Sequence, residues 1–168
     1  MIGYRGCYRY VDNPELFNLE LQTLARVREQ NPNLHLMIPF VRTKWELEKC
    51  LELVDASPLG RQRGLHRWVM AEVPSVVYWL PEYVGMGIDG VSIGSNDLTQ
   101  LMLGVDRDSD LCAELYDESD AAVLDAIEEE VAPLYYERNA SGFSPGWVQR
   151  SRHAMSTVIP RFNMRRTV

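Results

Sequence analysis

Short apolar runs of strand length alternate with helical patterns, and this alternation is the feature that most restricts the fold. The runs are residues 34–41 (LHLMIPFV), 68–73 (WVMAEV) and 89–93 (DGVSI). Apolar residues recur at helical spacing in segments that precede or follow them, over residues 14–30, 43–55, 75–84 and 98–103. Strand, crossover helix and strand in repetition predict an α/β fold with a parallel sheet.

Local signals set the expected ends of these elements. Asn13 before Pro14 predicts the cap of the first helix. Thr43, with Glu46 three residues later, predicts a capping box for the second helix. Pro81 should bend or shorten the third helix. The nearly continuous apolar run 34–41 predicts a strand buried on both faces.

The pattern changes near residue 117. We expect an acidic helix over 121–138, a loop over 139–146 and a basic amphipathic helix over 147–158. Strand alternation stops at this point. We therefore divide the chain into an α/β part, residues 1–120, and a helical segment, residues 121–168.

Net charge, apolar stretches and cysteine spacing argue against several classes of protein. A net charge of −7 argues against a general nucleic-acid binder, which needs a basic face. The sequence shows neither a signal-peptide pattern nor an apolar stretch long enough to span a bilayer. Its three cysteines lie far apart, and no zinc-site spacing is present. We expect reduced thiols and a soluble cytoplasmic protein.

Polar side chains lie at or just past the ends of the three predicted strands, where parallel α/β folds bind ligands. They are Arg42, Glu72 and Asp97. Two carboxylates at neighbouring strand ends suit Mg²⁺, which takes its other ligands from water and substrate. The adjacent turn Gly94-Ser95-Asn96 offers backbone N–H groups, a hydroxyl and an amide to a phosphate or carboxylate.

Arg5, between Gly3 and Gly6, offers a planar fork for a phosphoryl or carboxylate group. Each residue also has a plainer interpretation. Glu72 could be a charge near a helix start, Asp97 a helix cap, and Arg5 a surface arginine. The residues alone indicate a metal or anion site on an α/β fold.

Four strings carry a resemblance to a known family. They are IGYRGCYRY, MIPFVRT, VMAEVPS and DGVSIGSNDLTQLMLGVDRDS, within residues 1–117. They resemble the C-terminal barrel of phosphoenolpyruvate (PEP) synthase, with pyruvate phosphate dikinase and enzyme I of the sugar phosphotransferase system as more distant relatives. The resemblance implies a partial (β/α)8 TIM barrel that binds PEP or pyruvate.

The resemblance also implies roles for the candidate residues. Glu72 and Asp97 match the two carboxylates that hold Mg²⁺, and Gly94-Ser95-Asn96 matches the positions that contact the pyruvate carboxylate or the phosphoryl group. Arg5 matches an arginine that binds the moving phosphoryl group, while Arg42 is an accessory candidate. The implied reaction transfers phosphate from a phosphohistidine to enolpyruvate, as in a pyruvate, water dikinase.

Several parts of that family find no counterpart in this sequence. They are the ATP-grasp module, the phosphohistidine domain and the cysteine that protonates the enolate. The resemblance therefore implies that this chain is one part of a larger enzyme and is inactive alone. It also implies that the missing modules are its partners, and it is compatible with an oligomer. The alternative is a non-catalytic binding or interaction fragment.

Residues 122–168 resemble a segment near the C-terminus of bacterial α-glucan phosphorylases, through EEEVAPLYYERN and GWVQRSRHAMSTVIPRFNMRRTV. Nothing here matches that family's pyridoxal phosphate lysine. This second resemblance implies packing surface without catalysis, and it makes a phosphorylase-related protein a further alternative.

Overall fold

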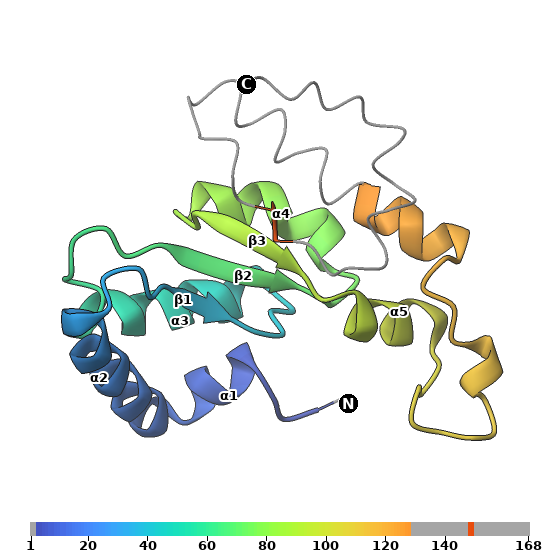
Figure 1. The fold of residues 1–168 in the computed structure, drawn as a ribbon, viewed down its shortest axis with the longest axis horizontal. Helices are drawn as coiled ribbons and strands as arrows, with labels where there is room; N and C mark the ends of the chain where they lie inside the picture. Colours follow the sequence, from blue (N-terminus) through green and yellow to red (C-terminus); the bar gives the residue numbers. More distant parts are fainter. Residues whose placement is uncertain (1–2, 129–147, 150–168) are drawn as a thin grey trace.

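A computed structural model describes residues 3–128 and 148–149 and has a parallel sheet flanked by helices (Figure 1). The sheet order is β1 (Leu36–Ile38), β2 (Arg67–Ala71), β3 (Gly90–Ile93) and β4 (Val148–Gln149). Each neighbouring pair is parallel. The predicted α/β class with a parallel sheet is confirmed.

Helices connect the first three strands, as expected of parallel neighbours. The helices are α1 (Cys7–Asp12), α2 (Pro14–Gln30), α3 (Lys44–Ala56), α4 (Val76–Gly85) and α5 (Ser95–Leu103), with a 3-10 turn η1 at Ala113–Leu115. Residues 121–128 are also helical. The prediction of a helix over residues 14–30 is confirmed at both ends.

Polar side chains cap the two longest helices. The Asn13 side chain accepts a hydrogen bond from the Leu16 N–H, as its position before Pro14 predicts. Thr43 Oγ1 accepts from the Glu46 N–H. A capping box also requires the Glu46 carboxylate to accept a hydrogen bond from the N–H of Thr43. Here the Glu46 carboxylate accepts instead from the N–H of Arg42, the residue before the cap.

The expected extent and burial of the first strand are wrong. β1 ends at Ile38 because Pro39 has no N–H for a ladder and Phe40 has a φ of 51°. Its burial alternates, and Met37 is 37% exposed, so the strand is not buried on both faces. Pro81 lies inside α4, which continues to Gly85, so the expected shortening does not occur, and the expected bend stays a prediction.

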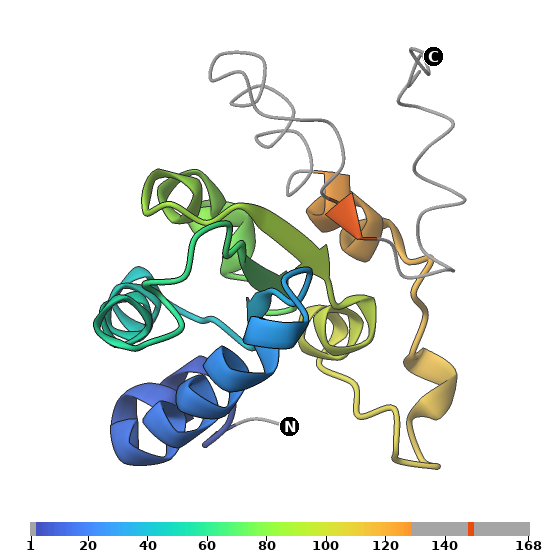
Figure 2. The same cartoon turned by 60° about the vertical axis from the view of Figure 1, so that its left-hand side comes forward.

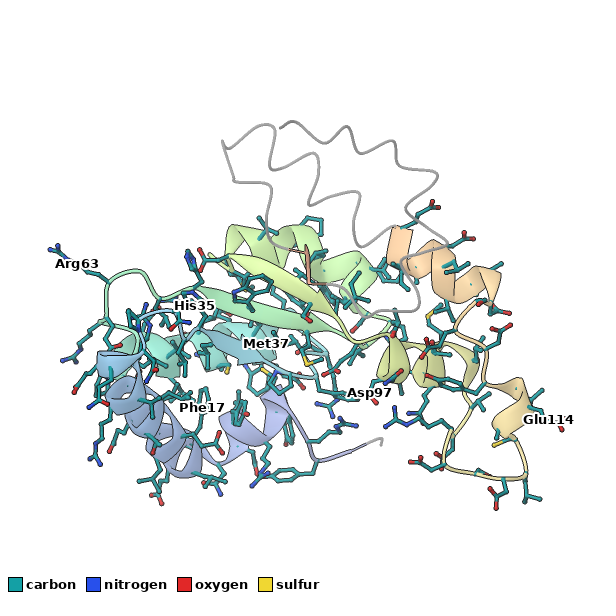
Figure 3. The ribbon with its side chains drawn as sticks, viewed as in Figure 1. Phe17, His35, Met37, Arg63, Asp97 and Glu114 are labelled. Atoms are coloured by element: carbon teal, nitrogen blue, oxygen red, sulfur yellow. The ribbon has the colours of Figure 1, made fainter. Side chains whose placement is uncertain are left out.

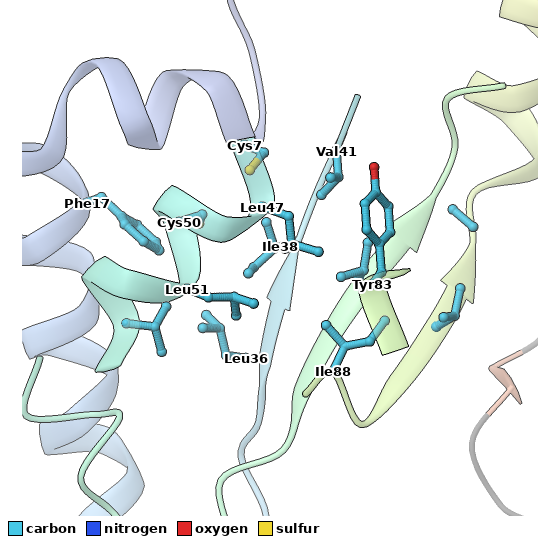
Figure 4. Packing of buried hydrophobic residues seen from close by; sticks show 14 of the residues in the cluster. Cys7, Phe17, Leu36, Ile38, Val41, Leu47, Cys50, Leu51, Tyr83 and Ile88 are labelled. Atoms are coloured by element: carbon cyan, nitrogen blue, oxygen red, sulfur yellow. The ribbon is translucent and has the colours of Figure 1, made fainter. Parts of the chain in front are cut away.

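The main core lies between one face of the sheet and the helices α2, α3 and α4 (Figure 2). Leu36, Ile38, Val69, Ala71 and Val91 supply the strand side. Their alternation in register places them on one face of the pleated sheet. Figure 4 shows Leu36 and Ile38 of β1 facing Leu47 and Leu51 of α3, with Phe17 of α2 farther to the left, near Cys50.

A second, smaller cluster joins the end of β3 to helical residues 121–128. It consists of Ile93, Leu98, Val123 and Ile127. The expected helix over 121–138 is confirmed across 121–128, and its remainder lies outside the described residues. The helix expected over 147–158 is wrong at Val148–Gln149, which pair with β3 as a strand. The division of the chain at residue 120 stays a prediction.

Within residues 3–128 and 148–149, no helix is both long and apolar enough to cross a membrane. All three cysteines are free, Cys7 and Cys50 in the core and Cys112 half-buried.

Candidate metal and phosphate site

The carboxyl ends of β2 and β3 bring Glu72 and Asp97 together. Glu72 directly follows β2, and Asp97 lies in the first turn of α5, just after β3. The two strands pair in parallel up to Ala71 and Ile93, and the Gly94 N–H then donates to the Ala71 carbonyl at 2.9 Å. Neighbouring strands therefore deliver both carboxyl groups to the same edge of the sheet.

Glu72 is a buried carboxyl, 4% exposed. Burial raises the pKa of Glu72, and the nearby Asp97 carboxyl raises it further through charge repulsion and a hydrogen bond. The Phe40 N–H, 2.6 Å from Glu72 Oε1, and the Arg5 cation oppose this rise of the pKa. The alternative that Glu72 is a charge near the start of the following helix loses support, because Glu72 is buried and lies four residues before Val76, where α4 begins.

Gly94 is pressed against Glu72. A Cβ at position 94 would lie 2.7 Å from both Cβ and Oε2 of Glu72, closer than such atoms approach. Only glycine allows the backbone at position 94 to come this near to the Glu72 side chain. The glycine in the predicted anion-binding turn thus also sets the place of the carboxylate.

The helix α5 begins three residues earlier than the spacing predicts, at Ser95 instead of Leu98. Ser95 and Asp97 therefore lie in its first turn, where backbone N–H groups point out of the helix start. The interpretation of Asp97 as a cap is wrong, because Gly94 occupies that position and no side chain caps the helix. Ser95 is buried, whereas Asn96 is exposed.

Tyr116 lies beside this turn and was not singled out by the sequence. Its hydroxyl donates to Glu118 Oε1 at 3.0 Å and lies 3.4 Å from Asn96 Oδ1. Burial, followed by the bond to Glu118, raises the pKa of Tyr116 to about 12. No motif or periodicity marks this residue.

Arg5 reaches the site from the N-terminal segment. Its Nη2 donates to Asp97 Oδ2 at 3.0 Å, with 41% of the Arg5 side chain and 14% of the Asp97 side chain exposed. Figure 3 shows Asp97 at one end of the sheet and His35 at the other. Arg5 is thus a partner of the carboxylate pair and not an isolated surface arginine.

Gly6 lets this segment lie against the end of β1. It has a φ of 61°, and a Cβ here would lie 2.4 Å from Phe40 Cβ and 2.7 Å from the Pro39 carbonyl oxygen. The Cys7 N–H donates to the same carbonyl at 2.9 Å. This close contact holds Arg5, the residue before Gly6, near the end of β1.

Phe40 connects the parts of the site and was missed by the sequence argument. Its left-handed backbone is uncommon for a bulky residue, and it turns the N–H toward Glu72. Its ring lies under the Arg5 guanidinium, 4.3 Å from the centroid. Only the preceding proline hints at an irregular strand end, and no sequence signal indicates a positive φ on phenylalanine.

The assembled site holds two carboxyl groups, one arginine and a helix start. In the part of the chain that the structure describes, no three His, Cys, Asp or Glu side chains form a metal-binding group. Two carboxylates alone fit a hard cation that draws its other ligands from water and from an anionic substrate. Arginine and a helix N-terminus suit the anionic oxygens of such a substrate.

Comparison with known proteins agrees with this chemistry. Residues 1–140 match the family described as PEP-utilising enzyme, PEP-binding domain. The chain belongs to this family. The chain is 48% identical over 134 residues to the phosphoenolpyruvate synthase of Aeropyrum pernix, a match that covers 76% of this chain and 16% of that protein. A probable phosphoenolpyruvate synthase of Staphylothermus marinus is 47% identical over 135 residues, with the same coverage.

The chain therefore spans 16% of the length of these relatives. A citrate lyase crystal structure from Burkholderia xenovorans covers 79% of this chain and 49% of its own, with a TM-score of 0.48 at 13% identity, which is too weak a likeness to carry an argument. The resemblance to the PEP synthase family is confirmed. The PEP-binding match continues through residue 140, so residues 122–140 of the phosphorylase-like segment fall inside it.

Proposed function

We propose that this chain is the PEP- and pyruvate-binding part of a PEP synthase-type phosphotransferase, a pyruvate, water dikinase. The observation that carries the proposal is the buried Glu72 carboxyl beside Asp97, with Arg5 bound to the same aspartate. These groups stand where the ends of parallel strands place ligand-binding residues, in keeping with a partial TIM barrel.

The carboxyl pair fits a divalent cation. Two carboxyl groups in contact, one of them buried, repel each other when both are ionised, and a cation between them removes that penalty. Glu72 and Asp97 would hold Mg²⁺, which supplies positive charge to the oxygens of the enolate and the phosphoryl group when bound. Carboxylate oxygens are the protein ligands that Mg²⁺ prefers.

The remaining residues would bind the anionic substrate. The Gly94 amide, the Ser95 hydroxyl and the Asn96 side chain lie at the start of α5, where donors suit a carboxylate or phosphoryl oxygen. Arg5 would leave Asp97 in part to bind the transferring phosphoryl group, whose oxygens carry negative charge throughout the transfer. The reaction is transfer from a phosphohistidine to enolpyruvate.

A full catalytic cycle needs further parts. In this proposal an ATP-grasp module, a phosphohistidine domain and a proton-donating cysteine act as partners, and the chain binds ligand without turning it over alone. We propose the cytoplasm as its compartment, where free cysteines remain reduced.

Calorimetric titration of oxalate, which imitates enolpyruvate, tests the site in the presence of Mg²⁺. The parent chain should bind oxalate only with Mg²⁺, and a Glu72→Gln/Asp97→Asn double variant should lose about 100-fold or more in affinity. Those substitutions keep side-chain size while removing both charges. Retention of parental affinity by the double variant would refute the proposed metal site.

A Glu29→Gln/Glu114→Gln double variant is the matched control. It removes two carboxylates that are exposed and lie outside the site, so its oxalate affinity should equal that of the parent.

The resemblance of residues 122–168 to glucan phosphorylases enters the proposal only as a packing surface without catalysis. Release of glucose 1-phosphate from glycogen by this chain would contradict that assignment.

A further inference from the structure

Arg42 reaches from the loop before α3 to the N-terminal segment. Its Nη1 donates to the carbonyl oxygen of Arg5 at 3.3 Å, and its Nη2 donates to the carbonyl oxygen of Gly3. These two carbonyls span the short segment that presents the Arg5 side chain. One guanidinium thus ties down the backbone on which Arg5 stands.

Arg42 is itself held from several directions. Its N–H donates to Glu46 Oε2 at 3.1 Å, and its Nη1 lies 3.8 Å from Glu46 Oε1. Its carbonyl accepts from the Ser75 hydroxyl at 2.6 Å. Only 24% of the Arg42 side chain and 7% of the Glu46 side chain are exposed. An arginine fixed in this way can act as a rigid support.

The ring of Phe40 is shared by the two arginines. The guanidinium of Arg42 is 4.6 Å from the ring centroid, and that of Arg5 is 4.3 Å away. Each cation has its own carboxylate, Glu46 for Arg42 and Asp97 for Arg5. The Arg42 guanidinium therefore binds Glu46 and the backbone of the N-terminal segment, whereas the Arg5 guanidinium binds Asp97 in the candidate site.

We propose that Arg42 is a positioning residue that fixes Arg5 for binding a phosphoryl group. This inference rests on the proposed function of Arg5. A planar fork can bond two backbone carbonyls at once, whereas the point charge of lysine cannot reproduce that geometry. Arg42 acts through Arg5 and contacts no substrate.

A double-mutant cycle with PEP as the ligand separates positioning from general support. In titrations with Mg²⁺, Arg5→Ala and Arg42→Ala should each lower the affinity for PEP by about tenfold. The Arg5→Ala/Arg42→Ala variant should bind PEP no more weakly than Arg5→Ala alone, because Arg42 has nothing left to position. Additive losses in the double variant would overturn the inference.

Two further variants sharpen the cycle. Arg42→Lys, which keeps the charge without the fork, should fall between Arg42→Ala and the parent. Lys44→Ala removes an exposed cation two residues away and should bind PEP like the parent. Full recovery of PEP affinity by Arg42→Lys would show that charge alone suffices and would overturn the role of the fork.

Hydrogen exchange supplies a measurement that needs no ligand. Peptides covering residues 3–8 should take up deuterium about tenfold faster in Arg42→Ala than in the parent, with Lys44→Ala unchanged. Unchanged exchange in Arg42→Ala would overturn the inference. If the parent chain binds neither PEP nor oxalate, the proposed function fails, and hydrogen exchange alone then decides whether Arg42 holds the Arg5 segment.

Discussion

Glu72 is a carboxyl group held where its charged form is disfavoured. Burial and the neighbouring Asp97 raise its pKa above the ordinary value of 4.5. A group whose pKa is raised by folding stabilises the fold fully below its unfolded pKa and loses that contribution as pH rises through its folded pKa. Without added metal, the protein should therefore lose stability at this residue as pH rises from acid toward neutrality.

Glu72→Gln isolates this effect because glutamine stays neutral and can still accept the Phe40 N–H. The free energy of unfolding of the parent, measured relative to that of Glu72→Gln, should fall as the pH rises above the ordinary pKa of glutamate, and should level off once the pH is well above the raised pKa of folded Glu72. Urea unfolding at several pH values gives this difference. A difference that does not change with pH would mean that Glu72 has the same pKa in the folded and unfolded chain.

The candidate residues themselves could be found from the sequence, but their contacts could not. Polar residues after buried runs led to Glu72 and Asp97, because strand ends in parallel sheets meet at one edge. The left-handed backbone of Phe40 and the contact of Gly94 with Glu72 depend on how segments far apart in sequence pack. No local pattern encodes such contacts.

The docking of α1 on the end of β1 is the element-scale feature on which Arg5 depends. Gly6→Ala would combine an unfavourable positive φ with a clash against Phe40 and the Pro39 carbonyl. It should lower the free energy of unfolding by about 2–4 kcal/mol, measured by urea denaturation.

Gly85→Ala is the matched control for Gly6→Ala. A Cβ at position 85 would meet no atom within 4 Å, and the residue has no positive φ. This substitution at the end of α4 should leave stability within about 0.5 kcal/mol of the parent or raise it slightly. Equal effects of the two alanines would show that α1 does not depend on the Gly6 contact.

At the same scale, elements with local signals were predicted well and those without them were not. Periodicity and a cap located α2 at both ends. The short α1, whose six residues give little periodic signal, went unpredicted. β1 was drawn too long because apolar character continues past Pro39, where the backbone leaves the strand conformation.

At the scale of the whole molecule, the second core cluster connects the sheet to helical residues 121–128. Ile127 is fully buried against this cluster. Ile127→Ala should lower the free energy of unfolding by about 2–5 kcal/mol while leaving a single transition. Leu111→Ala, at a fully exposed leucine, is the control and should have little effect.

Tryptophan fluorescence and far-ultraviolet circular dichroism should report coincident transitions for Ile127→Ala. An early transition, seen by one probe and absent from the parent, would instead support the division at residue 120 that the change of sequence pattern predicts. Strand alternation predicted the α/β class that residues 3–128 adopt. It could not reveal this cluster, since the cluster joins residues some thirty positions apart.

The absence of a side chain at Gly94 also limits how the site can be redesigned. If position 94 is randomised, nearly every variant that keeps the Glu72 carboxylate in its place should have glycine there. Any larger residue at position 94 must displace Glu72. Asn96, two residues later, is exposed, so a change in its size need not displace Glu72, and its side chain is one of those proposed to bind the substrate. An engineer seeking to admit bulkier acids would begin there.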